Sequence, residues 1–192
     1  MGNNQRTYRG VGKYSGNKLK NLKCTMVDAN FLVAYVSPKT SEEDKARIDF
    51  PINSIEKSNG RIIIPMPAMA EYLVGADIAG IETINKLERK AYIYIAPFDR
   101  LAAFECALID RAALGGGDKR DGSNLPWQKI KIDRQIVAIG KSLGATLVIS
   151  QDEGVCKNAL RVGINSCRIQ ELPLPESTRQ HKLELIIDNA VG

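Results

Sequence analysis

Four acidic residues stand out because of the sequence around them: Asp28, Glu71, Asp133 and Asp152. Asp28 directly follows an apolar run. Asp152 stands two residues after the end of a second apolar run. Glu71 (in PAMAEYL) and Asp133 (in KIDRQIVAIG) interrupt apolar helical stretches. An ionised carboxylate costs free energy on an apolar face unless another group compensates it. Acids in such positions therefore indicate a functional site.

Clustered carboxylates predict a site for a hard divalent cation. Mg²⁺, with Mn²⁺ as a substitute, prefers oxygen ligands. One or two such ions can polarise a phosphoryl oxygen, orient an attacking water and stabilise the leaving oxygen. Without a cation these acids repel one another, so Mg²⁺ should stabilise the protein.

Other site chemistries have little support. The chain has one histidine, His181, which disfavours Ser-His-Asp and Cys-His mechanisms. No C-x-x-C pair occurs, so neither a zinc site nor a disulfide framework is indicated. The cysteines are best interpreted as small buried apolar residues; they are Cys24, Cys106, Cys156 and Cys167.

Apolar runs alternate with longer amphipathic segments along the chain. We expect strands at 22–27, 61–64, 91–95, 146–150 and 164–169. Helices are expected at 31–36, at 41–60 with an interruption or kink at Pro51, around Glu71, at 78–89, 97–114 and 130–143, and after Gln151. This alternation predicts a three-layer α/β/α sandwich with a mainly parallel central sheet. Ligands bind such sheets at the carboxyl ends of the strands. If the strands before Asp28 and Asp152 are neighbours, both acids lie at one edge.

Charge is distributed unevenly over the 192 residues. The net charge is +5, yet residues 1–23 hold six bases and no acid, so the rest carries one more acid than base. We interpret 1–21 as a flexible basic arm, 22–170 as the folded domain and 171–192 as an extension with a helix at 177–189. With no signal segment or membrane span, a cytoplasmic protein is expected.

The series VDAN at 27–30, PAMAEYL, KIDRQIVAIG and LVISQD resembles the PIN-domain nucleases, most closely the VapC-like toxin branch. The resemblance runs in order over residues 22–169. It implies that the four acids bind metal and hydrolyse RNA, with Asn30 and Ser150 in supporting positions. We then expect Asp28 and Asp152 to contact the metal most directly, with Asp133 beside them and Glu71 acting through water or on the nucleophile. The resemblance also implies a homodimer inhibited by a small antitoxin. The basic arm, the C-terminal extension and the glycine-rich loop at 115–128 depart from the family pattern.

Bases near an acidic site can hold an anionic substrate. The candidates for RNA contacts are Lys119, Arg120, Lys129 and Lys131, and a solvated surface loop is the alternative. Trp127 is expected to pack beside Pro126, although it could stack on a base.

Several alternatives stay open. Asp28 and Asp152 could each be a helix N-cap, and Glu71 and Asp133 could be partners of Arg134 or another base. At the level of function, the alternatives are a housekeeping PIN nuclease in RNA maturation and a non-cleaving PIN-like module that binds RNA or protein. A phosphatase of the haloacid dehalogenase type is disfavoured, because it would need an Asp where the chain has Asn30.

Overall fold

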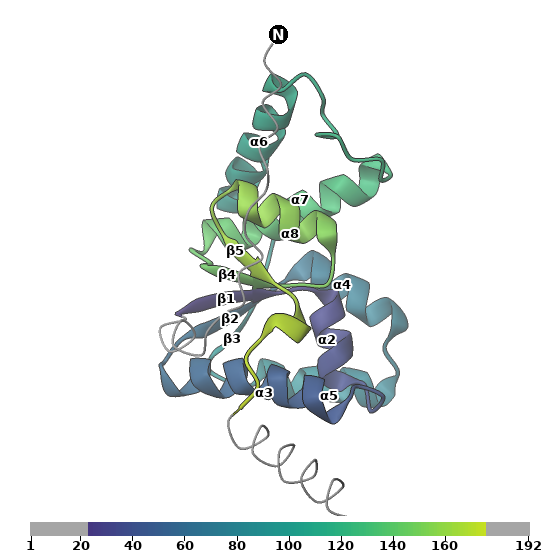
Figure 1. Cartoon of the computed structure of the whole chain (residues 1–192), viewed down its shortest axis with the longest axis vertical. Coiled ribbons are helices and arrows are strands. Elements are labelled where there is room, and N and C mark those ends of the chain that lie inside the picture. Colours follow the sequence, from purple (N-terminus) through teal and green to yellow (C-terminus); the bar gives the residue numbers. More distant parts are fainter. Residues whose placement is uncertain (1–22, 176–192) are drawn as a thin grey trace, which may run out of the picture.

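The protein is described by a computed structural model that covers residues 23–175. The expected basic arm and the expected helix at 177–189 lie outside these residues. At the centre is a five-stranded sheet in the order β3-β2-β1-β4-β5, in which every neighbouring pair is parallel (Figure 1). The strands are β1 (Cys24–Val27), β2 (Arg61–Pro65), β3 (Ile93–Ala96), β4 (Leu147–Ile149) and β5 (Asn165–Cys167).

Helices cover both faces of the sheet, which confirms the predicted α/β/α sandwich. Figure 1 shows α6, α7 and α8 on one side and α2, α3 and α5 on the other. The bounds are α2 (Ala29–Val36), α3 (Glu42–Lys57), α4 (Met66–Gly75), α5 (Ile78–Glu88), α6 (Arg100–Gly115), α7 (Trp127–Ser142) and α8 (Glu153–Arg161), followed by the short 3₁₀ helix η1 (Ile169–Glu171). None of the helices in the described range is long and apolar enough to cross a membrane.

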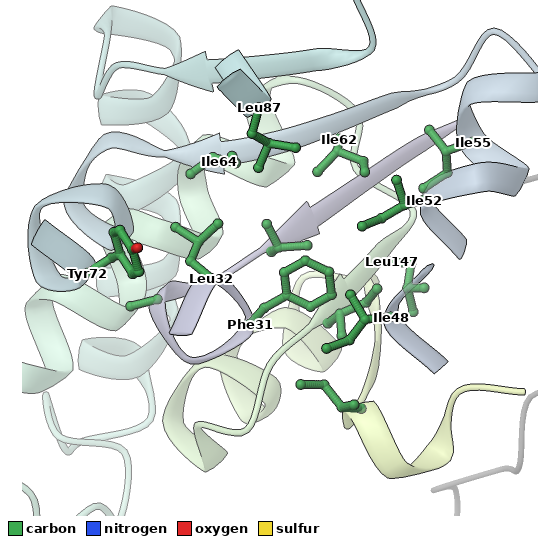
Figure 2. Close-up of a cluster of buried hydrophobic side chains, with 14 of the residues drawn as sticks. Phe31, Leu32, Ile48, Ile52, Ile55, Ile62, Ile64, Tyr72, Leu87 and Leu147 are labelled. Carbon is green, nitrogen blue, oxygen red and sulfur yellow. The ribbon is translucent and has the colours of Figure 1, made fainter. Parts of the chain in front are cut away.

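Alternate residues of the strands fill two separate cores, because successive side chains of a strand point to opposite faces. Val27, Ile62 and Leu147 pack with α2, α3 and α5 in the core drawn in Figure 2. Met26 and Val148 point the other way and pack with α6, α7 and α8. Both faces are therefore buried, which explains why these strands are apolar throughout.

Helix α3 differs from the expectation at one residue. Ser41 caps its N-terminus through its Oγ, which accepts a hydrogen bond from the backbone N of Asp44 at 3.1 Å, as the acidic first turn suggested. The helix then continues through Pro51 to Lys57, so of the predicted interruption or kink at this proline, the interruption is wrong. Pro51 is buried on the same face as Ile48 and Ile52, and this packing offsets the loss of one backbone hydrogen bond.

The strand order positions the acids. β1 and β4 are neighbours, with Met26 opposite Val148 and Val27 opposite Ile149. The residues that follow the two strands therefore meet at the carboxyl edge of the sheet, as expected if the strands before Asp28 and Asp152 are neighbours.

The core also extends past residue 170. Leu172 is fully buried in the core of Figure 2, and its carbonyl accepts a hydrogen bond from Arg47 of α3. Residues 171–175 thus pack against the folded body of the protein.

Candidate functional site

Asp28 lies at the junction of β1 and α2 and is almost completely buried. Its Oδ1 accepts a hydrogen bond from the backbone N of Phe31 at 3.0 Å, which caps α2. Its Oδ2 accepts a hydrogen bond from the hydroxyl of Ser150. Burial raises the pKa of Asp28, although hydrogen bonds from Ser150, Phe31 and Asn30 oppose the rise.

Asp152 begins α8 and is joined to Asp28 through Ser150. The Oγ of Ser150 also accepts a hydrogen bond from the backbone N of Asp152 at 2.9 Å. The Oδ1 of Asp152 caps α8 by accepting from the backbone N atoms of Gly154 at 2.8 Å and Val155 at 3.2 Å. The capping interpretation of both aspartates is therefore correct. At Asp152 capping uses only one oxygen, so Oδ2 is available to the site.

Asp133 contributes a buried carboxylate from the adjacent helix. α7 starts at Trp127, which is earlier than expected, so Asp133 lies in its second turn and its side chain is only 1% exposed. Its carboxylate lies so close to Gly154 that a Cβ at that position would collide with it. Glycine at the start of α8 thus lets α7 approach closely. Asp133 Oδ2 accepts no hydrogen bond from the described residues.

Lys129 joins the carboxylates. Its Nζ lies 2.8 Å from Oδ1 of Asp133, 2.8 Å from Oδ2 of Asp152 and 3.6 Å from Oε1 of Glu71. Lys129 is therefore the basic partner of Asp133 and Glu71 that the sequence left open as an alternative. Arg134 instead pairs with Asp110, because consecutive helix residues point about 100° apart.

Glu71 reaches this cluster from a different environment than expected. Its side chain is 46% exposed, whereas Met69 and Tyr72 of α4 are buried. The prediction that Glu71 interrupts a buried apolar face is therefore wrong. α4 directs Ala68, Met69 and Tyr72 at the cores, and Glu71 lies on its outer side.

The electrostatics of the cluster follow from burial and from the ammonium. Burial raises the pKa of Asp133 to about 6, and the charges of Asp152 and Glu71 add to the rise against the opposing effect of Lys129. Burial would also raise the pKa of Asp152, but the hydrogen bond and charge of Lys129 and the N–H groups of α8 lower it overall. Burial by itself would lower the pKa of Lys129, but its contacts with Asp133 and Asp152 raise it.

A groove of about 700 Å³ borders the cluster and combines acidic and basic groups. Asn30, Lys129, Asp133 and Asp152 line it, together with the loop at Gly122–Leu125 and with Arg120, Lys157 and Arg161. A second hollow, of about 360 Å³, is lined by Asp28, Glu71, Lys129 and Asp152.

The predicted RNA contacts divide between two environments. Arg120 and Lys129 line the larger groove. The Nζ of Lys119 instead lies 5.1 Å from the centre of the Trp127 ring, and Lys131 is exposed on α7.

Sequence reasoning missed the contributions of four residues to this region. Lys157 and Arg161 line the groove from α8, and their spacing of four on an amphipathic helix was an available signal. Gly154 had a weaker signal, a glycine in the first turn of a helix. Lys129 was considered only as an RNA contact, although it stands four residues before Asp133 on the same helix.

Carboxylate oxygens with one buried, unpartnered acceptor are the donor set that a hard divalent cation prefers. However, no three acidic, histidine or cysteine side chains within residues 23–175 are grouped so that they could hold a metal ion as they stand. The ammonium of Lys129 lies between three of the acids instead. The donor chemistry thus fits a cation, and a cationic group already occupies the centre.

Comparison with known proteins bears on the fold. No protein-family model matches the sequence, and no curated protein matches it. Among solved structures, the chain is similar to VapBC2 from Rickettsia felis bound to a DNA fragment from its promoter, with a TM-score of 0.53 and 12% identity, over 76% of this chain and 98% of that chain. It is also similar to VapBC-1 from nontypeable Haemophilus influenzae, with a TM-score of 0.50 and 13% identity, over 77% and 98% of the two chains. The chain therefore has a PIN-like α/β/α fold.

Proposed function

We propose that this protein is a metal-dependent endoribonuclease that hydrolyses RNA phosphodiester bonds at the four-carboxylate site. The observation that carries the proposal is the meeting of Glu71, Asp133 and Asp152 around one cationic group at the carboxyl edge of the sheet, with Asp28 joined to Asp152 through Ser150. The PIN-like fold supports it.

In this proposal Asp28, Asp133 and Asp152 hold Mg²⁺ or Mn²⁺, and Glu71 acts through water or on the nucleophile. The bound cation supplies a polarised phosphoryl oxygen and an activated water. Ser150 keeps Asp28 and Asp152 in a fixed relation through its two hydrogen bonds. The bases of the groove, Arg120, Lys157 and Arg161, attract the RNA backbone.

Cleavage of a panel of tRNA, rRNA and single-stranded RNA with Mg²⁺, Mn²⁺ or EDTA tests the activity. The wild type should cut with either metal and not with EDTA. The cleavage rate of Asp28→Asn should be lower than that of the wild type by about 100-fold or more. Asn retains the capping function, so the loss would not reflect loss of α2. The matched control is Asp77→Asn, because Asp77 caps α5 in the same way, through the backbone N of Gly80 at 2.7 Å. Equal cutting by wild type and Asp28→Asn would overturn the assignment.

We further propose that the protein is the toxin of a toxin–antitoxin pair, held by a protein antitoxin and acting as a homodimer. The similarity to VapBC structures supports this role. Induced expression should then arrest growth of a host for the wild type and for Asp77→Asn but not for Asp28→Asn. Light scattering of the purified protein should give twice the monomer mass. Normal growth with active enzyme would favour a housekeeping nuclease in RNA maturation, and a protein that binds RNA without cutting it would be a binding module.

A further inference from the structure

Lys129 makes more contacts with acids than an ordinary surface ion pair does. Its ammonium has three N–H donors and stands among three carboxylates from α4, α7 and the start of α8. Lys129 is 30% exposed, whereas Asp133 is 1% exposed and Asp152 18%. An ion pair in this partly water-excluded setting is stronger than one on the open surface.

The position between the acids attracts a cation for a reason independent of Lys129. Asp133 is buried among other acids, and its Oδ2 has no hydrogen-bond partner in residues 23–175. A buried carboxylate without a partner is costly. Any cation that enters between Asp133 and Asp152 lowers the cost of burying this carboxylate; in this structure the ammonium does so at Oδ1, and Oδ2 accepts no hydrogen bond from residues 23–175.

We propose that Lys129 is an internal counter-cation, which occupies the position between the carboxylates in the metal-free protein and must leave it for a divalent cation to bind. This inference rests on the proposed function, since it assumes that the same carboxylates bind metal. Lys129 thereby sets the metal affinity of the site and keeps the metal-free protein folded.

The surroundings of Lys129 allow it to leave. It lines both hollows that meet at the acids, so its flexible stem can carry the ammonium into either without movement of α7. In the larger groove the displaced ammonium joins Arg120 and Lys157, where it can contact an anionic substrate. A lysine suits this role better than an arginine, because its ammonium is a point charge on a flexible chain and has no bidentate geometry to lose.

Mn²⁺ binding measured by titration calorimetry on the full chain tests the inference. Lys129→Met keeps an apolar stem and removes the charge, so it should bind Mn²⁺ about tenfold or more tightly than the wild type. In EDTA the same variant should melt at a lower temperature, because its carboxylates repel without a counter-charge. The control is Lys157→Met: Lys157 lines the same groove but contacts the backbone carbonyl of Asp121 at 3.3 Å, not the acids. Its Mn²⁺ affinity should stay within about twofold of the wild type.

A measurement on the wild type keeps the test independent of whether Lys129→Met folds. In a nitrogen-15 spectrum of the lysine ammonium groups, the Lys129 signal should be protected from exchange in EDTA and should lose that protection when Mg²⁺ saturates the protein. An ammonium signal unchanged by Mg²⁺, or an Mn²⁺ affinity unchanged or weakened in Lys129→Met, would overturn the inference. If the wild type binds Mn²⁺ and cuts RNA in those cases, only the role of Lys129 fails. If the wild type neither binds Mn²⁺ nor cuts, the proposed function fails with it.

Discussion

At the scale of single residues, the two capping aspartates of the site, Asp28 and Asp152, use their two oxygens differently. In Asp152 one oxygen accepts N–H groups of α8 and the other contacts Lys129. In Asp28 one oxygen caps α2 and the other binds Ser150. A capping role and a place in the site therefore do not exclude each other, and the caps fix the direction in which the remaining oxygens point.

Asp133 should make the stability of the metal-free protein depend on pH. Its pKa is about 6 in the folded protein, against an ordinary value of 3.8. Between these values the folded state binds more protons than the unfolded state, so the free energy of unfolding falls as pH rises. Asp133→Asn removes this titration, and in EDTA it should gain about 1–3 kcal/mol relative to the wild type between pH 4 and pH 7.

Urea unfolding of both proteins at pH 4, 5, 6 and 7 measures this difference. Asp44→Asn, in the first turn of α3, is the control for the loss of one carboxylate outside the site. A difference between Asp133→Asn and the wild type that does not change over this range would show that Asp133 is not perturbed by its surroundings.

The site could be predicted in part at this scale. Asp28 and Asp152 were identifiable because each follows the end of an apolar strand, and Asp133 because it interrupts an apolar helix face. The exposure of Glu71 could not be predicted. The rotation of α4 about its axis decides which side chains are exposed, and it depends on which residues of α4 pack into the two cores. The place of Lys129 was missed for a similar reason: its contacts with Asp152 and Glu71 cross between helices, and only its spacing from Asp133 is local.

At the scale of elements, a buried arginine attaches the polar loop to α6 and α7. The Arg134 side chain is 1% exposed; it donates to Oδ1 of Asp110 on α6 at 2.6 Å and to the carbonyl of Lys119 in the loop at 2.8 Å. Its guanidinium also lies 5.6 Å from the centre of the Trp127 ring. Part of this loop lines the groove beside the acids, and Arg134 lines the same groove, so Arg134 helps to shape it.

Removal of Asp110 should therefore destabilise the protein and loosen the loop. Asp110→Ala leaves a buried guanidinium without its carboxylate, which should cost about 1–3 kcal/mol in urea unfolding. Trypsin should then cut at Lys119 and Arg120 several times faster than in the wild type. Glu105→Ala, on the same helix, is the control and should change neither measurement appreciably. Wild-type stability and digestion in Asp110→Ala would show that Lys119 and Trp127 suffice to hold Arg134.

The elements themselves were largely predictable, because a strand that is buried on both faces needs an apolar run, as in β2 and β4, and amphipathic helical segments separate the strands. The first and last residues of the elements were less predictable. α7 begins three residues earlier than expected, at Trp127, because that residue packs on Lys119 and Arg134 rather than extending the loop. Helix α3 passes Pro51 because burial of the ring outweighs one lost hydrogen bond.

At the scale of the whole molecule, the metal-free chain keeps several like charges close together and should be stabilised by their ligand. Saturating Mg²⁺ or Mn²⁺, at about 100 times the dissociation constant, adds about 2.7 kcal/mol. For a chain of this size that corresponds to a rise in melting temperature of roughly 5–10 °C. Calorimetric melts with and without the metal measure it. Asp133→Asn should show less than half of the rise, and an equal rise in both proteins would place the stabilising metal elsewhere.

The pairing of β1 with β4 also has a consequence for the time during synthesis at which the carboxylate cluster is completed. Asp28 is made early and Asp152 late, and Ser150, which joins them, is 122 residues away from Asp28 along the chain. Contacts between such distant segments form late in folding. A nascent chain on the ribosome therefore carries an incomplete carboxylate cluster until Ser150 and Asp152 have emerged. If the protein cuts RNA, the messenger and ribosome that produce it are protected from each new copy during most of its synthesis.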